Sequence, residues 1–133
     1  MINVVLDTNV VLAAYLTQGA ASKIVKLWAE GKFELLISDD IVKEYLRILL
    51  VKKIEPELVS EFNQQLTRFA RLICPSKEFK IVKDDPADDK FFECAIEGTA
   101  DFIVSNDKHL LNVKKYKAVK VVSVQDFLKK FER

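Results

Sequence analysis

Residues 2–9 read Ile2-Asn3-Val4-Val5-Leu6-Asp7-Thr8-Asn9, a short apolar run that ends in three polar side chains. Such a run, rich in β-branched residues and too short for a helix, predicts a buried strand of a parallel sheet. Four further runs of the same kind follow, at 34–37, 80–82, 101–104 and 119–122. Segments with helical periodicity separate them, at 10–16, 21–30, 39–50, 57–73, 87–97, 108–113 and 124–131.

This alternation predicts right-handed β-α-β units, and therefore an α/β fold with a mostly parallel sheet and helices on both faces. The 133 residues contain 3 Gly and 3 Pro and no low-complexity linker, so we expect a single domain over 1–133. No apolar run approaches the about 18 residues of a membrane span, and no leader-like segment is visible at the start. We expect a soluble, cytoplasmic protein without a membrane partner.

Several residues at helix ends carry local signals. Ser38 is a predicted N-cap, and Asp85 followed by proline is another. Gly31 and Gly98 each follow a helical run, where a left-handed residue is usual. The 57–73 segment has an apolar stripe that predicts a core-facing helix with a smaller chance of a partner surface, namely Leu58, Phe62, Leu66, Phe69 and Ile73.

The two cysteines and the single histidine suggest no chemistry of their own. Cys74 and Cys94 lack metal-ligand spacing and stand in apolar surroundings, which favours reduced structural thiols. His109 is alone, so a zinc cage and a catalytic triad are both disfavoured.

Four acids follow the predicted strands, where ligands bind in open parallel sheets. They are Asp7 after the first strand, Glu44 and Asp88 in the helices after the second and third, and Asp107 after the fourth. Each has a structural alternative: Asp7 and Asp107 as helix caps, and Asp88 as the third helical residue after an Asp85 cap.

Glu44 and Asp88 fit that alternative least well, because both adjoin the apolar stripes of their helices. A core-facing carboxylate costs several kcal/mol unless a cation or strong donors compensate it, and no Lys or Arg of these stripes is placed to neutralise both. A bound metal ion would do so. Oxygen ligands with almost no His or Cys favour Mg²⁺ or Mn²⁺, one or two ions, and such sites commonly cleave phosphodiesters with an activated water.

The chain resembles the PIN-domain nucleases, particularly the compact toxins of VapBC-type toxin–antitoxin pairs. The resemblance covers essentially the whole chain and depends on four segments in order, at 5–10, 38–45, 85–91 and 100–108. It implies a three-layer α/β/α sandwich with about five strands, and ribonuclease activity. It also implies an RNA substrate, a small antitoxin partner and a homodimer, to which the 57–73 helix would contribute.

Carried over by position, the resemblance implies an acidic metal pocket formed by Asp7, Glu44, Asp88 and Asp107. Thr8, Asn9 and Ser105 would support these ligands. Asp89 stands where the family often has Asn, so Asp85 and Asp89 are second choices for the third acid; Asp88 is preferred because it aligns with Phe91, Phe92 and Ala95. Asn106 stands where Gly is common, which is acceptable because Asn also enters left-handed conformations.

Other functional classes fit less well. A haloacid-dehalogenase-type phosphatase needs a second Asp where Asn9 stands, and a receiver domain needs its acceptor Asp after the third strand. The main alternative is a non-catalytic module of the same fold that binds RNA or an antitoxin. Four convergent negative charges would not help such a module to bind phosphates.

The net charge of +1 means that clustering some of the 20 acids leaves a relatively basic remaining surface. Basic side chains that would guide an RNA backbone are Arg47, Lys52, Lys53, Lys108, Lys114, Lys115 and Lys117. For any one of them, a solvated charged surface is the simpler interpretation.

Overall fold

The structure, a computed structural model, describes residues 1–76 and 88–132. Its strands and helices alternate along most of the chain. In order they are β1 (Asn3–Leu6), α1 (Thr8–Leu16), α2 (Ala20–Ala29), β2 (Glu34–Ile37), α3 (Asp39–Val51), α4 (Pro56–Phe69), β3 (Arg71–Leu72), α5 (Asp89–Glu97), β4 (Phe102–Val104), α6 (Lys108–Leu111), β5 (Lys115–Tyr116), β6 (Val119–Val122) and α7 (Val124–Lys129).

The described strands form one six-stranded sheet in the order β3-β2-β1-β4-β6-β5. All neighbouring strands are parallel except β5 and β6. In the centre, Leu6 pairs with Val104, and Val104 pairs with Val122. The residues that follow β1 and β4 therefore emerge side by side at the same edge of the sheet. The predicted α/β class, mostly parallel sheet and flanking helices are confirmed.

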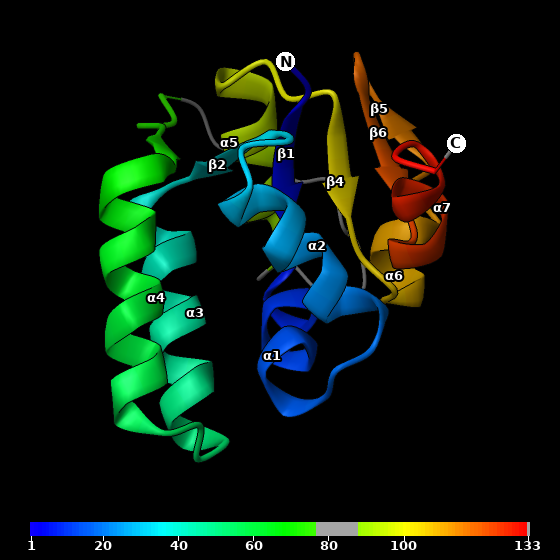
Figure 1. Cartoon of the computed structure of the whole chain (residues 1–133). Helices are drawn as coiled ribbons and strands as arrows, with labels where there is room; N and C mark the ends of the chain where they lie inside the picture. Colours follow the sequence, from blue (N-terminus) through cyan, green and yellow to red (C-terminus); the bar gives the residue numbers. More distant parts are fainter. Residues whose placement is uncertain (77–87, 133) are drawn as a thin grey trace.

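Helices cover both faces of this sheet. In Figure 1, α2 lies in front of the central strands, while α5 lies behind them and α7 flanks the β6 side. Helices α3 and α4 form an antiparallel pair on the β2 side, and α1 begins directly below β1. The carboxyl ends of β1 and β4 consequently point to the region between α1 and α6.

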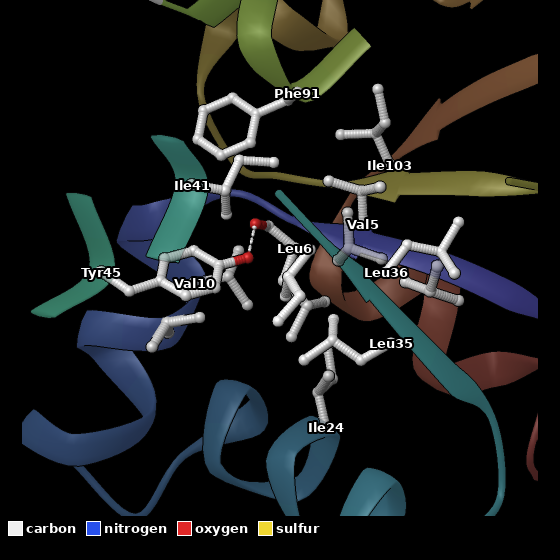
Figure 2. Close-up of a cluster of buried hydrophobic side chains, with 14 of the residues drawn as sticks. Val5, Leu6, Val10, Ile24, Leu35, Leu36, Ile41, Tyr45, Phe91 and Ile103 are labelled. Atoms are coloured by element: carbon white, nitrogen blue, oxygen red, sulfur yellow. Dashed lines mark hydrogen bonds between the residues drawn. The ribbon is translucent and has the colours of Figure 1, made fainter. Parts of the chain in front are cut away.

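The core depends on β1, whose Val4, Val5 and Leu6 are almost wholly buried. Figure 2 shows Phe91 on one side of the strands and Ile24 on the other, with Tyr45 beside the end of β1. The wholly buried Tyr45 donates its hydroxyl hydrogen to the Leu6 carbonyl, and burial raises the pKa of Tyr45 well above its usual range. This bond attaches α3 to the strand end just before Asp7.

The strand count and one helix end differ from the sequence prediction. The sheet has six described strands rather than about five, because the short β5 was not predicted and β3 occupies the end of the predicted 57–73 helix. That helix ends at Phe69, since Arg71 and Leu72 pair with β2, a tertiary contact that local periodicity cannot show. The predicted strand at 80–82 lies outside the described residues.

The apolar stripe predicted for the 57–73 helix is only partly core. Phe62, Leu66 and Ile73 are buried, but Leu58 is 38% exposed and Phe69 is 65% exposed. Val59 is buried and fills the place expected of Leu58, because the buried face of α4 is rotated toward it. The exposed pair leaves apolar surface on α4.

The two predicted glycine helix ends have different outcomes. Gly31 is left-handed (φ 76°) after α2, as expected. After α5 the left-handed residue is Thr99 (φ 54°), so the prediction for Gly98 was wrong by one position. Gly98 is needed for space instead, because a Cβ there would lie 2.8 Å from Leu36 Cδ1 and 3.0 Å from Ile73 Cδ1.

Other local predictions can be compared directly. Ser38 caps α3 by accepting the Ile41 N–H at 3.3 Å, as predicted. Both cysteines are free thiols, although Cys74 is exposed rather than in apolar surroundings; burial raises the pKa of the Cys94 thiol to about 12. His109 is exposed and belongs to no histidine, cysteine or acidic cluster of the described chain. None of the described helices has the length and apolar character needed to cross a membrane.

Candidate functional site

Asp7 lies at the carboxyl end of β1 and is only 4% exposed. Its backbone N–H donates to the Val104 carbonyl at 3.0 Å, which extends the pairing with β4 by one residue. Its Oδ2 accepts a hydrogen bond of 2.8 Å from the Ser105 hydroxyl, and the backbone N–H of Asn9 lies near enough to lower the pKa of the carboxyl group. The local structure thus holds this carboxylate rigidly at the sheet edge.

The surroundings of Asp7 make its negative charge costly. Burial raises the pKa of Asp7 from 3.8 to about 6, against the lowering effect of the Ser105 hydrogen bond and of the nearby Asn9 N–H. The negative charges of Asp107 and Glu44 raise the pKa further, which shows that both carboxylates lie within electrostatic reach of Asp7. A cation at this position would relieve the desolvation and the repulsion together.

Asp107 follows β4 and is held through the same serine. Ser105 is wholly buried, and its Oγ accepts the Asp107 backbone N–H at 2.9 Å while donating to Asp7. The Asp107 side chain accepts the His109 N–H at 2.8 Å and so caps α6. The alternative reading of Asp107 as a helix cap is therefore correct, and this contact uses one of its two oxygens. Asn106 does not adopt a left-handed conformation; its Oδ1 accepts the Val124 N–H at 3.1 Å.

Glu44 lies in the second turn of α3 and has two partners. Thr8 donates its hydroxyl hydrogen to Glu44 Oε2, and Lys90 Nζ lies 2.7 Å from Glu44 Oε1. The side chains of Lys90 and Glu44 are 16% and 21% exposed. The sequence argument asked only for a Lys or Arg of the two stripes that would neutralise both Glu44 and Asp88, and it did not identify Lys90, which reaches Glu44 from α5. Spacing along α3 alone could not reveal a partner on another helix.

The acids come near one another without forming a complete cage. Across residues 1–76 and 88–132, no three carboxylate, thiol or imidazole side chains stand close enough together to hold an ion as they are. The hydrogen bonds above explain this, since Glu44 is turned to Thr8 and Lys90 while Asp107 is turned to the start of α6. Binding an ion would require one or both of these side chains to rotate.

Asp88, the third acid predicted from the sequence, lies at the start of α5. This helix begins at Asp89, so Asp88 is its N-cap residue, without a side-chain cap bond, rather than a residue of the first turn as expected. Asp88 is half-buried, and Asp89 is 8% exposed. Phe91, Phe92 and Ala95 are wholly buried. Asp85 and its predicted cap with Pro86 lie outside the described residues.

The basic residues named from the sequence are exposed, but they lie in different places. Lys108 directly follows Asp107, and Arg47 is one turn beyond Glu44 on α3. Lys115 pairs with Lys120, which pairs with Phe102 at the beginning of β4, and Lys117 lies in the turn beyond. The structure thus places Lys115 and Lys117 at the end of the sheet opposite the carboxyl ends of β1 and β4. Lys90, which was not selected from the sequence, adjoins Glu44.

Comparison with known proteins establishes the family. The sequence matches the PIN domain over residues 3–109, and the chain therefore belongs to the PIN-domain family. The matched region includes all of the acids described above. Among proteins with curated descriptions, none matches the sequence significantly.

A solved structure shares the fold. It is a chain of the crystal structure of VapBC2 from Rickettsia felis bound to a DNA fragment from their promoter. The superposition has a TM-score of 0.61 and covers 92% of this chain and 98% of that chain, at 15% sequence identity. At this identity the likeness shows the fold, and the site has to be argued from this chain's own residues.

Proposed function

We propose that this PIN-domain protein is a divalent-metal-dependent endoribonuclease that hydrolyses phosphodiester bonds of RNA in the cytoplasm. The observation that carries the proposal is the state of Asp7. A buried carboxylate with a pKa raised to about 6 by burial and by two neighbouring carboxylates, at the carboxyl edge of a parallel sheet, is a costly arrangement. Membership of the PIN-domain family supports the same conclusion.

The chemistry of the donors fits Mg²⁺ or Mn²⁺. Asp7, Glu44 and Asp107 offer hard carboxylate oxygens, and Asp88, with Asp89 as the alternative, would add another from α5. None of these proposed ligands is an imidazole or a thiol. These acids would hold one or two ions, which when bound would activate a water molecule and stabilise the charge on the phosphate oxygens.

The protein's own residues would prepare that site in three ways. Ser105 fixes the orientation of Asp7 and the backbone that leads to Asp107. Thr8 orients Glu44 from one side. Lys90 supplies a positive charge at Glu44, which reduces the repulsion among the neighbouring carboxylates. The same charge would also attract the phosphate of an approaching substrate.

The partner proposal is a toxin role with a small antitoxin, and a homodimer. It is supported by the family and by the fold shared with a VapBC2 structure. The exposed apolar side chains Leu58 and Phe69 on α4 provide surface for such contacts. Inhibition of RNA cleavage by the product of the neighbouring reading frame tests the antitoxin. Light scattering tests the dimer, and a monomer at high concentration contradicts it.

The activity is tested by incubating purified protein with single-stranded RNA and Mn²⁺. We expect cleavage that EDTA abolishes and that Asp7→Asn reduces at least about a hundredfold. Asp126→Asn is the matched control, because Asp126 is an exposed acid of α7. Equal cleavage by wild type and Asp7→Asn, with and without EDTA, would exclude the proposal and favour the non-catalytic binding module.

A further inference from the structure

A cavity of about 410 Å³ opens beside the acids, between α1, the start of α2 and the start of α7. Its size falls within the range of small-molecule sites. Asp107 belongs to its wall, so the cavity is continuous with the candidate active site. The described residues that line it are Asn9, Val10, Ala13, Thr17, Ala20, Ala21, Asn106, Asp107, Val124 and Gln125.

The lining suits a neutral, flat group with polar edges. Asn9, Asn106 and Gln125 contribute side-chain amides, while small aliphatic side chains from α1, α2 and α7 form the apolar surface. No Lys or Arg is among the described lining residues, so a phosphate or another anion is poorly matched. No aromatic side chain is among them either, so recognition would depend on hydrogen bonds more than on stacking.

One of these amides is already oriented. Asn106 Oδ1 accepts the Val124 N–H at 3.1 Å, which holds this amide beside the start of α7 and leaves its NH₂ group for another partner. Gln125 follows on the same helix and is exposed, and Asn9 is exposed at the start of α1. Side-chain amides are the groups that pair with the edges of nucleobases, and unpaired RNA bases are read in this way.

We propose that this cavity binds one nucleobase of single-stranded RNA, next to the phosphodiester that is cleaved. The inference rests on the proposed ribonuclease function and deepens it, because it assigns base selection to Asn106 and Gln125. The position follows from two connections: Asp107 is shared by the acids and the cavity, and the Asn9 backbone contacts Asp7. The enzyme would therefore prefer one kind of base at one position beside the cut.

The test maps the cuts made by wild type, Gln125→Ala and Ala13→Leu in a pool of single-stranded RNAs of random sequence. We expect wild type to prefer one base at one position. Gln125→Ala should weaken that preference at least about fivefold, because a single base contact is removed. Ala13→Leu should fill the cavity and weaken it as well. Gln64→Ala, an exposed glutamine on α4, is the matched control, and thermal melting confirms folding.

A second measurement does not require activity. The side-chain amide NMR signals of Asn106 and Gln125 are followed in EDTA while each of the four ribonucleoside monophosphates is added. We expect both signals to shift, most strongly with one base, and Gln64 to remain unchanged. If wild type cuts no RNA but these signals shift, the proposed function fails while the base site stands.

Two results would overturn the base site. One is RNA cleavage by wild type with a preference that Gln125→Ala and Ala13→Leu leave unchanged. The other is an unchanged preference together with weaker inhibition of Gln125→Ala by the product of the neighbouring reading frame. That second result would assign the cavity to a protein segment.

Discussion

Ser105 donates its hydroxyl hydrogen to Asp7 Oδ2 at 2.8 Å, although 98 positions separate the two residues. The hydroxyl oxygen of Ser105 also accepts a hydrogen bond from the Asp107 backbone N–H at 2.9 Å. One buried hydroxyl therefore sets the orientation of one acid and the backbone position of another.

Ser105→Ala should raise the pKa of Asp7 above about 6, because the Ser105 hydrogen bond lowers it. The acid side of the RNA cleavage profile should move to higher pH. Unfolding free energy should fall by about 1 to 3 kcal/mol, since the Asp107 N–H loses its acceptor. Ser123→Ala, which removes the cap of α7, controls for loss of a hydroxyl elsewhere. An unchanged pH profile would show that Ser105 has only a structural role.

Asp7→Asn should stabilise the metal-free protein at pH 7.5. The folded-state pKa of Asp7 is raised from 3.8 to about 6, so its charged form favours unfolding. The free energy of unfolding should therefore fall as the pH rises from about 4 to 6, and then stay lower. Above about pH 6, the total loss in the free energy of unfolding is at most about 3 kcal/mol. Melting in EDTA at pH 4 and pH 7.5 measures it.

In this experiment Asp126→Asn is the control and should follow wild type at both pH values. Adding Mg²⁺ at pH 7.5 should raise the melting temperature of wild type and leave Asp7→Asn nearly unchanged. Asp7→Asn less stable than wild type at pH 7.5 and equal at pH 4 would contradict the raised pKa.

Lys90→Met should increase the affinity for Mn²⁺ by about three- to tenfold, because the Lys90 ammonium competes with a metal ion for Glu44 Oε1. Without metal, the variant should lose about 1 to 2 kcal/mol of stability, since a partly buried carboxylate loses its partner. Titration calorimetry measures the affinity. Lys52→Met, an exposed lysine at the end of α3, removes the same charge away from Glu44. Weaker Mn²⁺ binding by Lys90→Met would show that Lys90 assists the site instead of competing.

Lys108→Glu should weaken RNA binding more than Lys117→Glu. Lys108 directly follows Asp107, while Lys117 lies at the opposite sheet edge. The logarithm of the binding constant falls linearly with the logarithm of the salt concentration, and losing one phosphate contact should reduce the size of this slope by about 0.7. Both changes carry the same charge, so each controls for the other when binding is measured across a salt series in EDTA. A larger effect of Lys117→Glu would move the RNA path to the β5–β6 turn.

Gly98→Ala should destabilise the protein by about 1 to 3 kcal/mol, because the added Cβ would lie 2.8 Å from Leu36 Cδ1 and 3.0 Å from Ile73 Cδ1 in a packed core. Gly19→Ala is the control, since a Cβ there meets only Thr17 Oγ1 at 3.4 Å. Chemical denaturation measures both. Equal stability of Gly98→Ala and wild type would mean that Leu36 and Ile73 repack freely.

Much of the fold could be predicted because apolar runs such as Val4 to Leu6 are continuous, short and rich in β-branched residues, which is typical of a buried strand. The family could be identified from four short segments. The two-residue strands β3 and β5 could not be predicted, because Arg71 and Lys115 become strand residues only through pairing with other strands. The local strand propensity of these residues does not reveal which strand they will pair with.

The candidate site, like the fold, could be predicted from the sequence only in part. The positions of Asp7 and Asp107 at strand ends follow from the sequence pattern. The ion pair of Lys90 with Glu44 depends on how α5 crosses α3, which no spacing within either helix determines. The left-handed conformation of Thr99 was not predicted, because the adjacent Gly98 was the expected left-handed residue. The small size of Gly98 serves packing instead.

The central place of β4 beside β1 also orders events during synthesis. A growing chain makes Asp7, Thr8 and Glu44 early, but Ser105 and Asp107, which follow the strand that pairs with β1, are made about 100 residues after Asp7. Until then Asp7 lacks its hydroxyl donor and its second acidic neighbour. Under the proposed function, the nascent chain would lack a complete active site until most of its residues had been made.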